Sequence, residues 1–342
     1  MKRRVAVTGL GVITPLGNDI NTLWDSLMNG KCAVDEVKRF DTTDQRTHKA
    51  AEVKDFDPEK YLAKSRIGKM GKASRFSIAA VKEALSMAGL EGKLVPENTG
   101  VMVGTTMGEV QILEKIDSQY FNGGVEKVDK SLFRMYPAHE IAQNIAGYFT
   151  AEGNNMTFPN ACAAGNYAIG YGFDLIREGE LDTVIAGGVD ILSQVAFTGF
   201  NRLFAMSPDL CRPFDLNRNG MMLSEGAAFL ILEDYDKAEK RGAEILAEVA
   251  GYGLSCDAHN MTIPQPEGKG AILAMKNALK SSNLTPKEID YINVHGTSTG
   301  ENDKVETLAI YNVFKEYAKK VHVSGTKSMY AHLMGGSSAL EA

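Results

Sequence analysis

Apolar runs rich in β-branched residues alternate along this chain with longer segments of helical periodicity. The runs predict strands at residues 4–8, 100–104, 183–187, 228–232, 245–250, 291–294 and 321–324, and the helical segments cover 77–90, 139–149, 163–177, 268–279 and 304–317. These strands are apolar throughout instead of alternating with polar positions, which is the pattern of a sheet covered on both faces. We therefore expect an α/β fold built in layers.

Composition narrows the class of protein. With 342 residues, 44% of them hydrophobic, the chain can bury a core large enough for one big domain or two halves. The formal net charge of −6 argues against nucleic acid as a partner, because phosphate binding draws on a basic surface. No stretch approaches the roughly 20 apolar residues that a membrane span needs. The cysteines show neither paired nor metal-ligand spacing, so we expect reduced thiols, a cytoplasmic location and no metal site: Cys32, Cys162, Cys211 and Cys256.

One cysteine occupies a position suited to a nucleophile. A short apolar strand at residues 156–158 leads into a tight turn, and Cys162 stands where the next helix is predicted to begin. Amide groups in the first turn of that helix would face the sulfur, and a helix N-terminus lowers a thiol's pKa by stabilising the thiolate. On spacing alone, a lone cysteine among apolar residues is more often an inert part of the core.

Two histidines far down the chain change that balance. His295 and His332 each lie in a glycine-flanked polar turn that follows a predicted strand. Strand ends that deliver polar residues into a crevice are the usual location of sites in open α/β sheets. A cysteine with histidines elsewhere in the sequence is also a pattern of nucleophilic catalysis. The three junctions together predict one site containing Cys162, His295 and His332.

The residues around these positions resemble the condensing-enzyme signature. The matching motifs are Asn160–Gly165 (NACAAG), His295–Thr299 (HGTST) and Thr326–Met329 (TKSM) followed by His332. Along essentially its whole length the chain resembles a β-ketoacyl-[acyl carrier protein] synthase of the type II, elongating class. The resemblance implies a decarboxylative Claisen condensation that lengthens a fatty acyl or polyketide chain by two carbons as 3-oxoacyl-carrier protein.

The resemblance also implies a fold and its division. The family has a thiolase-like fold, a five-layered α-β-α-β-α sandwich of two similar halves. These would fall at residues 1–250, carrying the nucleophilic cysteine, and 251–342, carrying the two histidines. Members of the family continue some tens of residues past the position of Ala342, through a Gly-Phe-Gly-Gly loop that contributes to the oxyanion hole. We therefore expect the second half to be incomplete.

Further residues take roles through the same resemblance. Cys162 would accept the acyl group, His295 and His332 would hold the thioester oxygen of malonyl-carrier protein, and Lys327 would pair with Glu341 and order the histidines. The remaining expectations concern substrate, partner and assembly: Thr297, Thr299 and, more weakly, Thr262 for the phosphopantetheine arm, Met107 and Phe200 for the acyl pocket, Lys64, Arg66 and Lys69 for docking an acidic carrier protein, and a homodimer. No diffusible cofactor is implied, because the pantetheine arrives on the carrier.

The basic positions can also be interpreted without a partner. Arg66, Lys69, Lys72 and Arg75 recur at every third position and would share a related face of one helix. An ordinary solvated helix face explains that spacing equally well. Three departures from the common family pattern leave a specialised polyketide or secondary-lipid role open: Ala163-Ala164 after the cysteine, Tyr330-Ala331 before His332, and Gly335-Gly336-Ser337-Ser338 in place of a more alanine-rich run.

Other classes fit the sequence less well. The motif argues against a dinucleotide-binding dehydrogenase, because Thr14 stands where the third glycine of G-x-G-x-x-G belongs. A Cys-His hydrolase offers no role for a second histidine and Lys327. A degradative thiolase needs a later catalytic cysteine, and none follows Cys256. A non-catalytic partner subunit, similar to a chain-length factor, would have lost the nucleophile that Cys162 provides.

Overall fold

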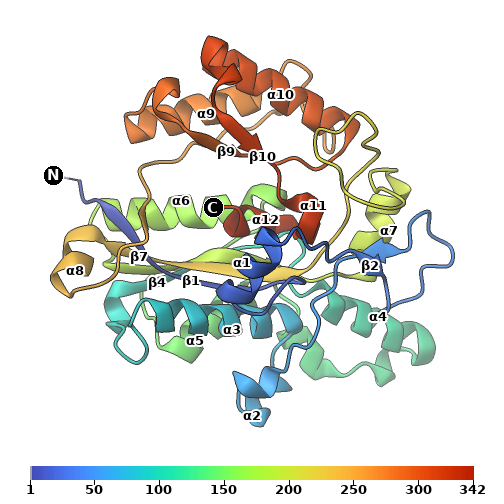
Figure 1. Cartoon of the computed structure of the whole chain (residues 1–342). Coiled ribbons are helices and arrows are strands. Elements are labelled where there is room, and N and C mark those ends of the chain that lie inside the picture. Colours follow the sequence, from blue (N-terminus) through green and yellow to red (C-terminus); the bar gives the residue numbers. More distant parts are fainter. Residues whose placement is uncertain (1) are drawn as a thin grey trace.

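The computed structural model describes residues 2–342 and is built around a mixed six-stranded sheet (Figure 1). The strand order is β5-β4-β6-β7-β1-β8. β4 runs parallel to both β5 and β6, whereas β7 pairs antiparallel with β6 and β1, and β1 antiparallel with β8. The strands are β1 (Val5–Ile13), β4 (Thr99–Gly104), β5 (Asn155–Phe158), β6 (Thr183–Asp190), β7 (Gly226–Asp234) and β8 (Ala247–Glu248).

Helices cover both faces of this sheet. α3 (Lys72–Met87) and α5 (His139–Phe149) pack on one face, and α6 (Ala164–Arg177) with α12 (Ser337–Leu340) on the other. On the α3 side the packing is so close that a Cβ on Gly9 or Gly11 of β1 would lie about 2 Å from the carbonyl oxygen of Ala84 or Ala80. β1, β4, β6 and β7 are therefore buried from both sides, as their sequence predicts. The prediction of burial is wrong for the strands expected at 245–250 and 321–324, because β8 and β10 (His322–Ser324) are exposed.

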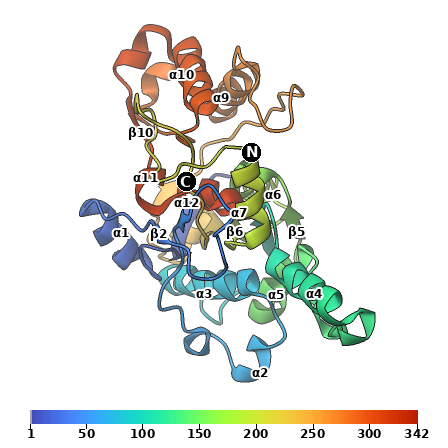
Figure 2. The ribbon, with the colours of Figure 1, turned by 90° about the vertical axis from the view of Figure 1, so that its right-hand side faces the viewer.

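A second, smaller sheet lies beyond α6 and α12. β9 (Tyr291–Asn293) and β10 (His322–Ser324) pair in parallel. α9 (Lys269–Ser282) and α10 (Gly300–Phe314) pack beside them around Val294, Ile310 and Phe314. Figures 1 and 2 show the resulting order of layers: α3 and α5, the large sheet, α6 and α12, the small sheet, and α9 and α10. The predicted layered α/β architecture is confirmed.

The remaining elements lie around these layers. No helix among residues 2–342 has both the length and the hydropathy needed to cross a bilayer. The other strands and helices are β2 (Asp35–Glu36), β3 (Lys49–Ala50), α1 (Ile20–Met28), α2 (Lys64–Ile67), α4 (Val110–Gly123), α7 (Gln194–Arg202), α8 (Tyr235–Lys240) and α11 (Lys327–Tyr330).

The expectation that four basic residues share one helix face is wrong. α2 ends at Ile67, the chain turns through residues 68–71, and α3 begins at Lys72. Lys72 is then drawn inward, where its ammonium lies 3.0 Å from the buried carboxylate of Glu225. Arg75 bonds back to the carbonyl of Gly71, 3.2 Å away. Only the part of the basic segment before α3 remains exposed.

Candidate active site

Cys162 lies where the large sheet meets α6. β5 ends at Phe158, and a single 3₁₀ turn (Ala161–Ala163) carries the cysteine into α6. Ala161 has φ +44°, a left-handed conformation that is uncommon outside glycine and costs on the order of 1–3 kcal/mol. The turn also presses on β4, because a Cβ on Gly104 would lie 2.2 Å from the carbonyl carbon of Ala164. The tight turn predicted before the helix is confirmed.

His332 is held against the end of the large sheet by backbone hydrogen bonds. Its N–H donates to the carbonyl of Met222 at 2.8 Å, and its carbonyl accepts from the N–H of Ser224 at 2.9 Å. The side chain is 1% exposed. The imidazole Nε2 lies 3.0 Å from the Cys162 sulfur, so residues 170 positions apart form one hydrogen bond.

The ring of His332 has a defined tautomer. The backbone N–H of Met334 donates to Nδ1 at 3.1 Å, so Nδ1 carries a lone pair and not a proton. The hydroxyl of Ser337, 2.7 Å from the same nitrogen, must then donate as well. In the neutral imidazole the proton therefore resides on Nε2 and points at the Cys162 sulfur.

His295 completes the group from the side of the small sheet. Its ring stands edge to face with that of His332, with centroids 5.2 Å apart. The Cys162 sulfur and one ring nitrogen from each of His295 and His332 lie within 4.8 Å of one another. A metal ion would bind a free lone pair on each ligand nitrogen. The nitrogen of His332 that faces Cys162 is Nε2, and it carries the ring proton because Nδ1 accepts the Met334 N–H.

The backbone of His295 is clamped from both sides. The side chain of Lys327 is fully buried, and its Nζ donates to the His295 carbonyl at 2.7 Å and to the Glu341 carboxylate at 2.5 Å. On the other side the Glu306 carboxylate accepts the N–H groups of His295 and Gly296, at 2.6 and 2.9 Å. The expected Lys327–Glu341 pair is present. Glu306, on α10, plays a part that the motifs did not predict.

Burial sets the charge of all three side chains. It raises the pKa of the Cys162 thiol to about 11, against the opposing effect of the Lys327 ammonium. This reverses the direction expected from the helix start, because loss of water outweighs the stabilisation of the thiolate. Burial, reinforced by Lys327, lowers the pKa of His295 to about 3 and holds that of His332 well below its usual value. Both histidines are therefore neutral hydrogen-bond donors at neutral pH.

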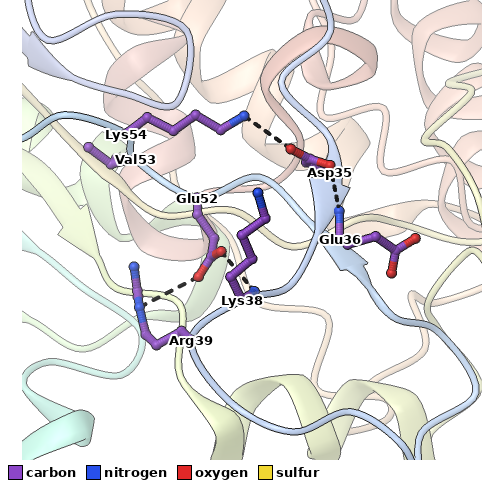
Figure 3. A pocket seen from close by; sticks show the side chains of 7 residues that line it. All are labelled: Asp35, Glu36, Lys38, Arg39, Glu52, Val53 and Lys54. Carbon is purple, nitrogen blue, oxygen red and sulfur yellow. Dashed lines mark hydrogen bonds and ion pairs between the residues drawn. The ribbon is translucent and has the colours of Figure 1, made fainter.

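The site opens into a cavity of about 310 Å³ whose wall includes Cys162, Asn293, His295 and Glu341. A cavity of about 380 Å³ elsewhere, beside β2, is lined by charged side chains (Figure 3). These charged side chains form ion pairs with one another: Lys54 lies 3.2 Å from Asp35, and Arg39 lies 3.6 Å from Glu52. Cysteine and histidine are absent from its lining, so the reactive chemistry belongs to the smaller cavity.

Two family profiles match the chain and together cover nearly all of it. That of the β-ketoacyl synthase N-terminal domain matches residues 2–238, and that of the C-terminal domain matches residues 246–342. The chain belongs to the β-ketoacyl synthase family. The 3-oxoacyl-[acyl-carrier-protein] synthase 2 of Synechocystis sp. is 38% identical to this synthase over 349 positions, covering 100% of the chain and 84% of that protein. The protein of the same name from Staphylococcus aureus strain COL is 35% identical, covering 99% of the chain and 84% of that protein.

Solved structures of the family superpose closely on this synthase. The ishigamide ketosynthase/chain length factor matches with a TM-score of 0.95 at 38% identity, covering 100% of this chain and 84% of that one. A type II PKS acyl-carrier protein in complex with its ketosynthase, bound to the hexaketide, matches with a TM-score of 0.92 at 28% identity, covering 100% and 85%. The expected thiolase-like fold is confirmed.

The other residues singled out in the synthase sequence have separate local surroundings. The hydroxyls of Thr297 and Thr299 bond to each other at 2.9 Å in the turn after His295. Thr262 lies in an exposed loop before α9, where its N–H donates to the side chain of Asn260. Met107 and Phe200 pack against a shared apolar cluster that includes Met334. Three basic residues are exposed: Lys64, Arg66 and Lys69.

Proposed function

We propose that this β-ketoacyl synthase condenses an acyl group carried on Cys162 with malonyl-carrier protein, releasing carbon dioxide and a 3-oxoacyl-carrier protein two carbons longer. The observation that carries the proposal is the contact of the Cys162 sulfur with a neutral His332 whose Nε2–H points at it, with His295 at its side. A thiol nucleophile and two uncharged N–H donors in one cavity suit covalent acyl transfer followed by enolate formation.

In the first stage an acyl group moves onto the protein. The Cys162 sulfur attacks the thioester carbonyl of an acyl-carrier protein, and the carrier's pantetheine thiolate leaves. The proton of the Cys162 thiol ends on that leaving group, so one thioester and one thiol exchange places. Burial raises the pKa of Cys162, so the resting group is a neutral thiol that gives up its proton only as the sulfur attacks.

In the second stage malonyl-carrier protein loses carbon dioxide, and the electron pair of the broken C–C bond becomes an enolate on the thioester. Nε2–H of His332, with His295 beside it, is placed to donate to that enolate oxygen. Neutral donors fixed in advance stabilise developing charge without reorganising at the moment of reaction. The enolate carbon then attacks the acyl-cysteine carbonyl, and the cysteine sulfur leaves and takes up a proton. The chemistry needs only side chains and the carrier-borne pantetheine, which we propose passes the hydroxyls of Thr297 and Thr299.

Elongation itself tests this function. We would incubate the synthase with an acyl-carrier protein and malonyl-carrier protein and identify the product thioester by mass spectrometry. The proposal predicts a 3-oxoacyl product longer than the acyl donor by two carbons, with one carbon dioxide released per product. Hydrolysis of the acyl thioester without a longer product would contradict it.

The partner we propose is an acidic carrier protein. A structural relative holds a ketosynthase together with its acyl-carrier protein. On this chain Lys64 and Arg66 are exposed on α2 and Lys69 is exposed just after it, and opposite charge steers such encounters. Both fatty acyl and polyketide chains are proposed as substrates, since a 3-oxoacyl-[acyl-carrier-protein] synthase 2 and a type II PKS ketosynthase both match the chain. The retained Cys162 favours a catalytic subunit over a chain-length-factor-like partner, and we keep the prediction of a cytoplasmic location.

We also propose that two copies of the synthase associate as a homodimer. β5 is an edge strand of the large sheet, with Met156 38% exposed. Beyond β4, α4 presents Phe121, 81% exposed, and the following segment presents Phe133, 56% exposed. An open strand edge and apolar side chains of this size are features that an interface covers. Light scattering at micromolar concentration should give twice the mass of one chain, and a persistent single-chain mass would contradict the proposal.

A change at Met107 should alter the length of acyl chain that is accepted. Met107 is flexible and packs with Phe200 and Met334 in the cluster next to His332, so phenylalanine there would fill the space with a stiffer ring. We expect Met107→Phe to shift the preferred acyl donor to shorter chains by about tenfold in kcat/KM, the effect of roughly 1.4 kcal/mol. Competition between carrier-bound donors of different length measures this. An unchanged profile would remove Met107 from the acyl pocket.

A further inference from the structure

One buried carboxylate joins two segments of the site that are far apart in sequence. Asp190 ends β6 and is 0% exposed. Its Oδ1 accepts the Thr105 hydroxyl at 2.9 Å and the Met107 N–H at 2.8 Å. Its Oδ2 accepts the Thr106 N–H at 2.8 Å and the Gly335 N–H at 2.7 Å. The loop after β4 and the segment after His332 therefore meet on one side chain.

The partners of Asp190 are all uncharged donors. Among residues 2–342, no lysine, arginine or histidine nitrogen forms an ion pair with this carboxylate. Burial raises its pKa to about 6, while the hydrogen bonds from the backbone and Thr105 act in the opposite direction. Four donors converging on two oxygens need an acceptor at every position, which only the ionised carboxylate supplies. An unpaired buried charge is costly, so its partners are placed to satisfy it fully.

The Gly335 bond reaches His332 through one peptide. Gly335 follows Met334, whose N–H donates to Nδ1 of His332 and so places the proton on Nε2. Gly335 packs so closely here that a side chain would not fit: a Cβ would lie 2.7 Å from the carbonyl carbon of Thr105 and 2.8 Å from Oδ2 of Asp190. On the other side, Asp190 fixes the backbone of Met107, whose side chain packs in the same cluster as Met334.

We propose that Asp190 is a positioning residue with two effects. It holds the Met107 wall of the acyl pocket in place, and it holds the backbone that sets the tautomer of His332. The carboxylate touches neither the sulfur nor the imidazole and acts through the backbones of Met107 and Gly335. Acyl-chain selection and the state of the donor histidine then depend on the same side chain. The part that concerns chain length rests on the proposed function, whereas the part that concerns the tautomer does not.

The test compares Asp190→Asn with Glu83→Gln. In asparagine one carboxylate oxygen becomes an NH₂ group, which cannot accept a hydrogen bond. Either the bond from Gly335 or the bonds from the loop after β4 (residues 105–107) must therefore break. Glu83 is the matched control: its carboxylate also accepts two backbone N–H groups, from Val12 at 2.9 Å and Ile20 at 2.7 Å, but it lies on α3, across the sheet from α6 (Figure 1). Both substitutions remove one carboxylate charge from a buried or half-buried position.

The decisive readout is the ¹⁵N NMR signature of the His332 ring, identified by its loss in His332→Ala. In the unsubstituted protein and in Glu83→Gln we expect a single tautomer with the proton on Nε2. In Asp190→Asn we expect a mixture of tautomers, a broader range of accepted acyl chains, and elongation slower by on the order of 10²-fold, the loss typical of reacting groups displaced by about 1 Å.

Asp190→Glu keeps the charge and moves its oxygens by one methylene, so it carries the test if the asparagine variant fails to fold. We expect partial retention of the single tautomer and a smaller loss of rate. A folded Asp190 variant whose His332 signal and product lengths match those of the unsubstituted protein would overturn the inference. Failure of the proposed function would appear differently, as an unsubstituted protein that does not elongate, and the NMR comparison would still decide the role of Asp190.

Discussion

Replacing Cys162 with alanine should abolish elongation while leaving decarboxylation of the malonyl thioester measurable. The substitution removes the only acyl acceptor of the proposed mechanism. It leaves the two histidines in place, because His332 is held by Met334 and Ser337, and the backbone of His295 by Lys327. We expect the 3-oxoacyl product to fall by on the order of 10³-fold or more, as for loss of other nucleophiles. Carbon dioxide and product would be measured in the same reaction.

The matched control for this substitution is Cys256→Ala, which removes an exposed thiol that does not line the cavity at Cys162. It should leave both rates unchanged. Elongation that survives in Cys162→Ala would show that another group accepts the acyl chain. If carbon dioxide release disappeared together with elongation, the sulfur would be needed for decarboxylation too. The proposal that Cys162 only accepts the acyl group while the histidines stabilise the enolate would then be wrong.

Replacing His332 with alanine should slow both decarboxylation and elongation. The substitution removes the Nε2–H donor placed to stabilise the enolate oxygen, an effect worth on the order of 10²–10³-fold in rate. It also leaves the Met334 N–H and the Ser337 hydroxyl without their buried acceptor, which should lower the free energy of unfolding by about 1–3 kcal/mol. Rates of carbon dioxide release and urea denaturation together measure the two effects.

His322→Ala makes the same chemical change at an exposed position of β10 and should affect neither quantity. A His332→Ala variant that still releases carbon dioxide at the original rate, but no longer forms product, would assign this histidine to acyl transfer instead of enolate stabilisation. Equal losses in both measurements agree with the proposed role.

Hydrophobic patterning predicted the layers well because the buried strands are apolar on both faces. The helix at 139–149 matches α5, and the strands at 183–187 and 228–232 lie inside β6 and β7. Local sequence failed where distant contacts decide. α3 begins at Lys72, earlier than its apolar pattern predicts, because the carboxylate of Glu109 accepts the N–H groups of Ala73 and Ser74 at 3.1 and 2.8 Å. The helices α1, α4 and α7 were not predicted.

The site was predicted to the extent that side chains of recognisable motifs form it. Cys162, His295 and His332 converge, and Lys327 pairs with Glu341. Residues that act through backbone groups carried no such signal: Glu306 holds the N–H of His295, and Asp190 holds that of Gly335. An acidic residue on the helix directly after a histidine turn would have been the only hint of Glu306. The pKa of Cys162 was predicted in the wrong direction because desolvation depends on the whole fold.

Acyl transfer to Cys162 is the central step of the proposed mechanism, and intact-protein mass spectrometry tests it most directly. The synthase would be incubated with acyl-carrier protein thioesters of increasing chain length, beside Cys162→Ala and beside acyl-pantetheine thioesters that lack the carrier. We predict a mass increase equal to one acyl group, lost in Cys162→Ala and formed faster from the carrier-bound donors. A folded, unsubstituted protein that gains no acyl mass, or gains it equally in Cys162→Ala, would contradict the mechanism.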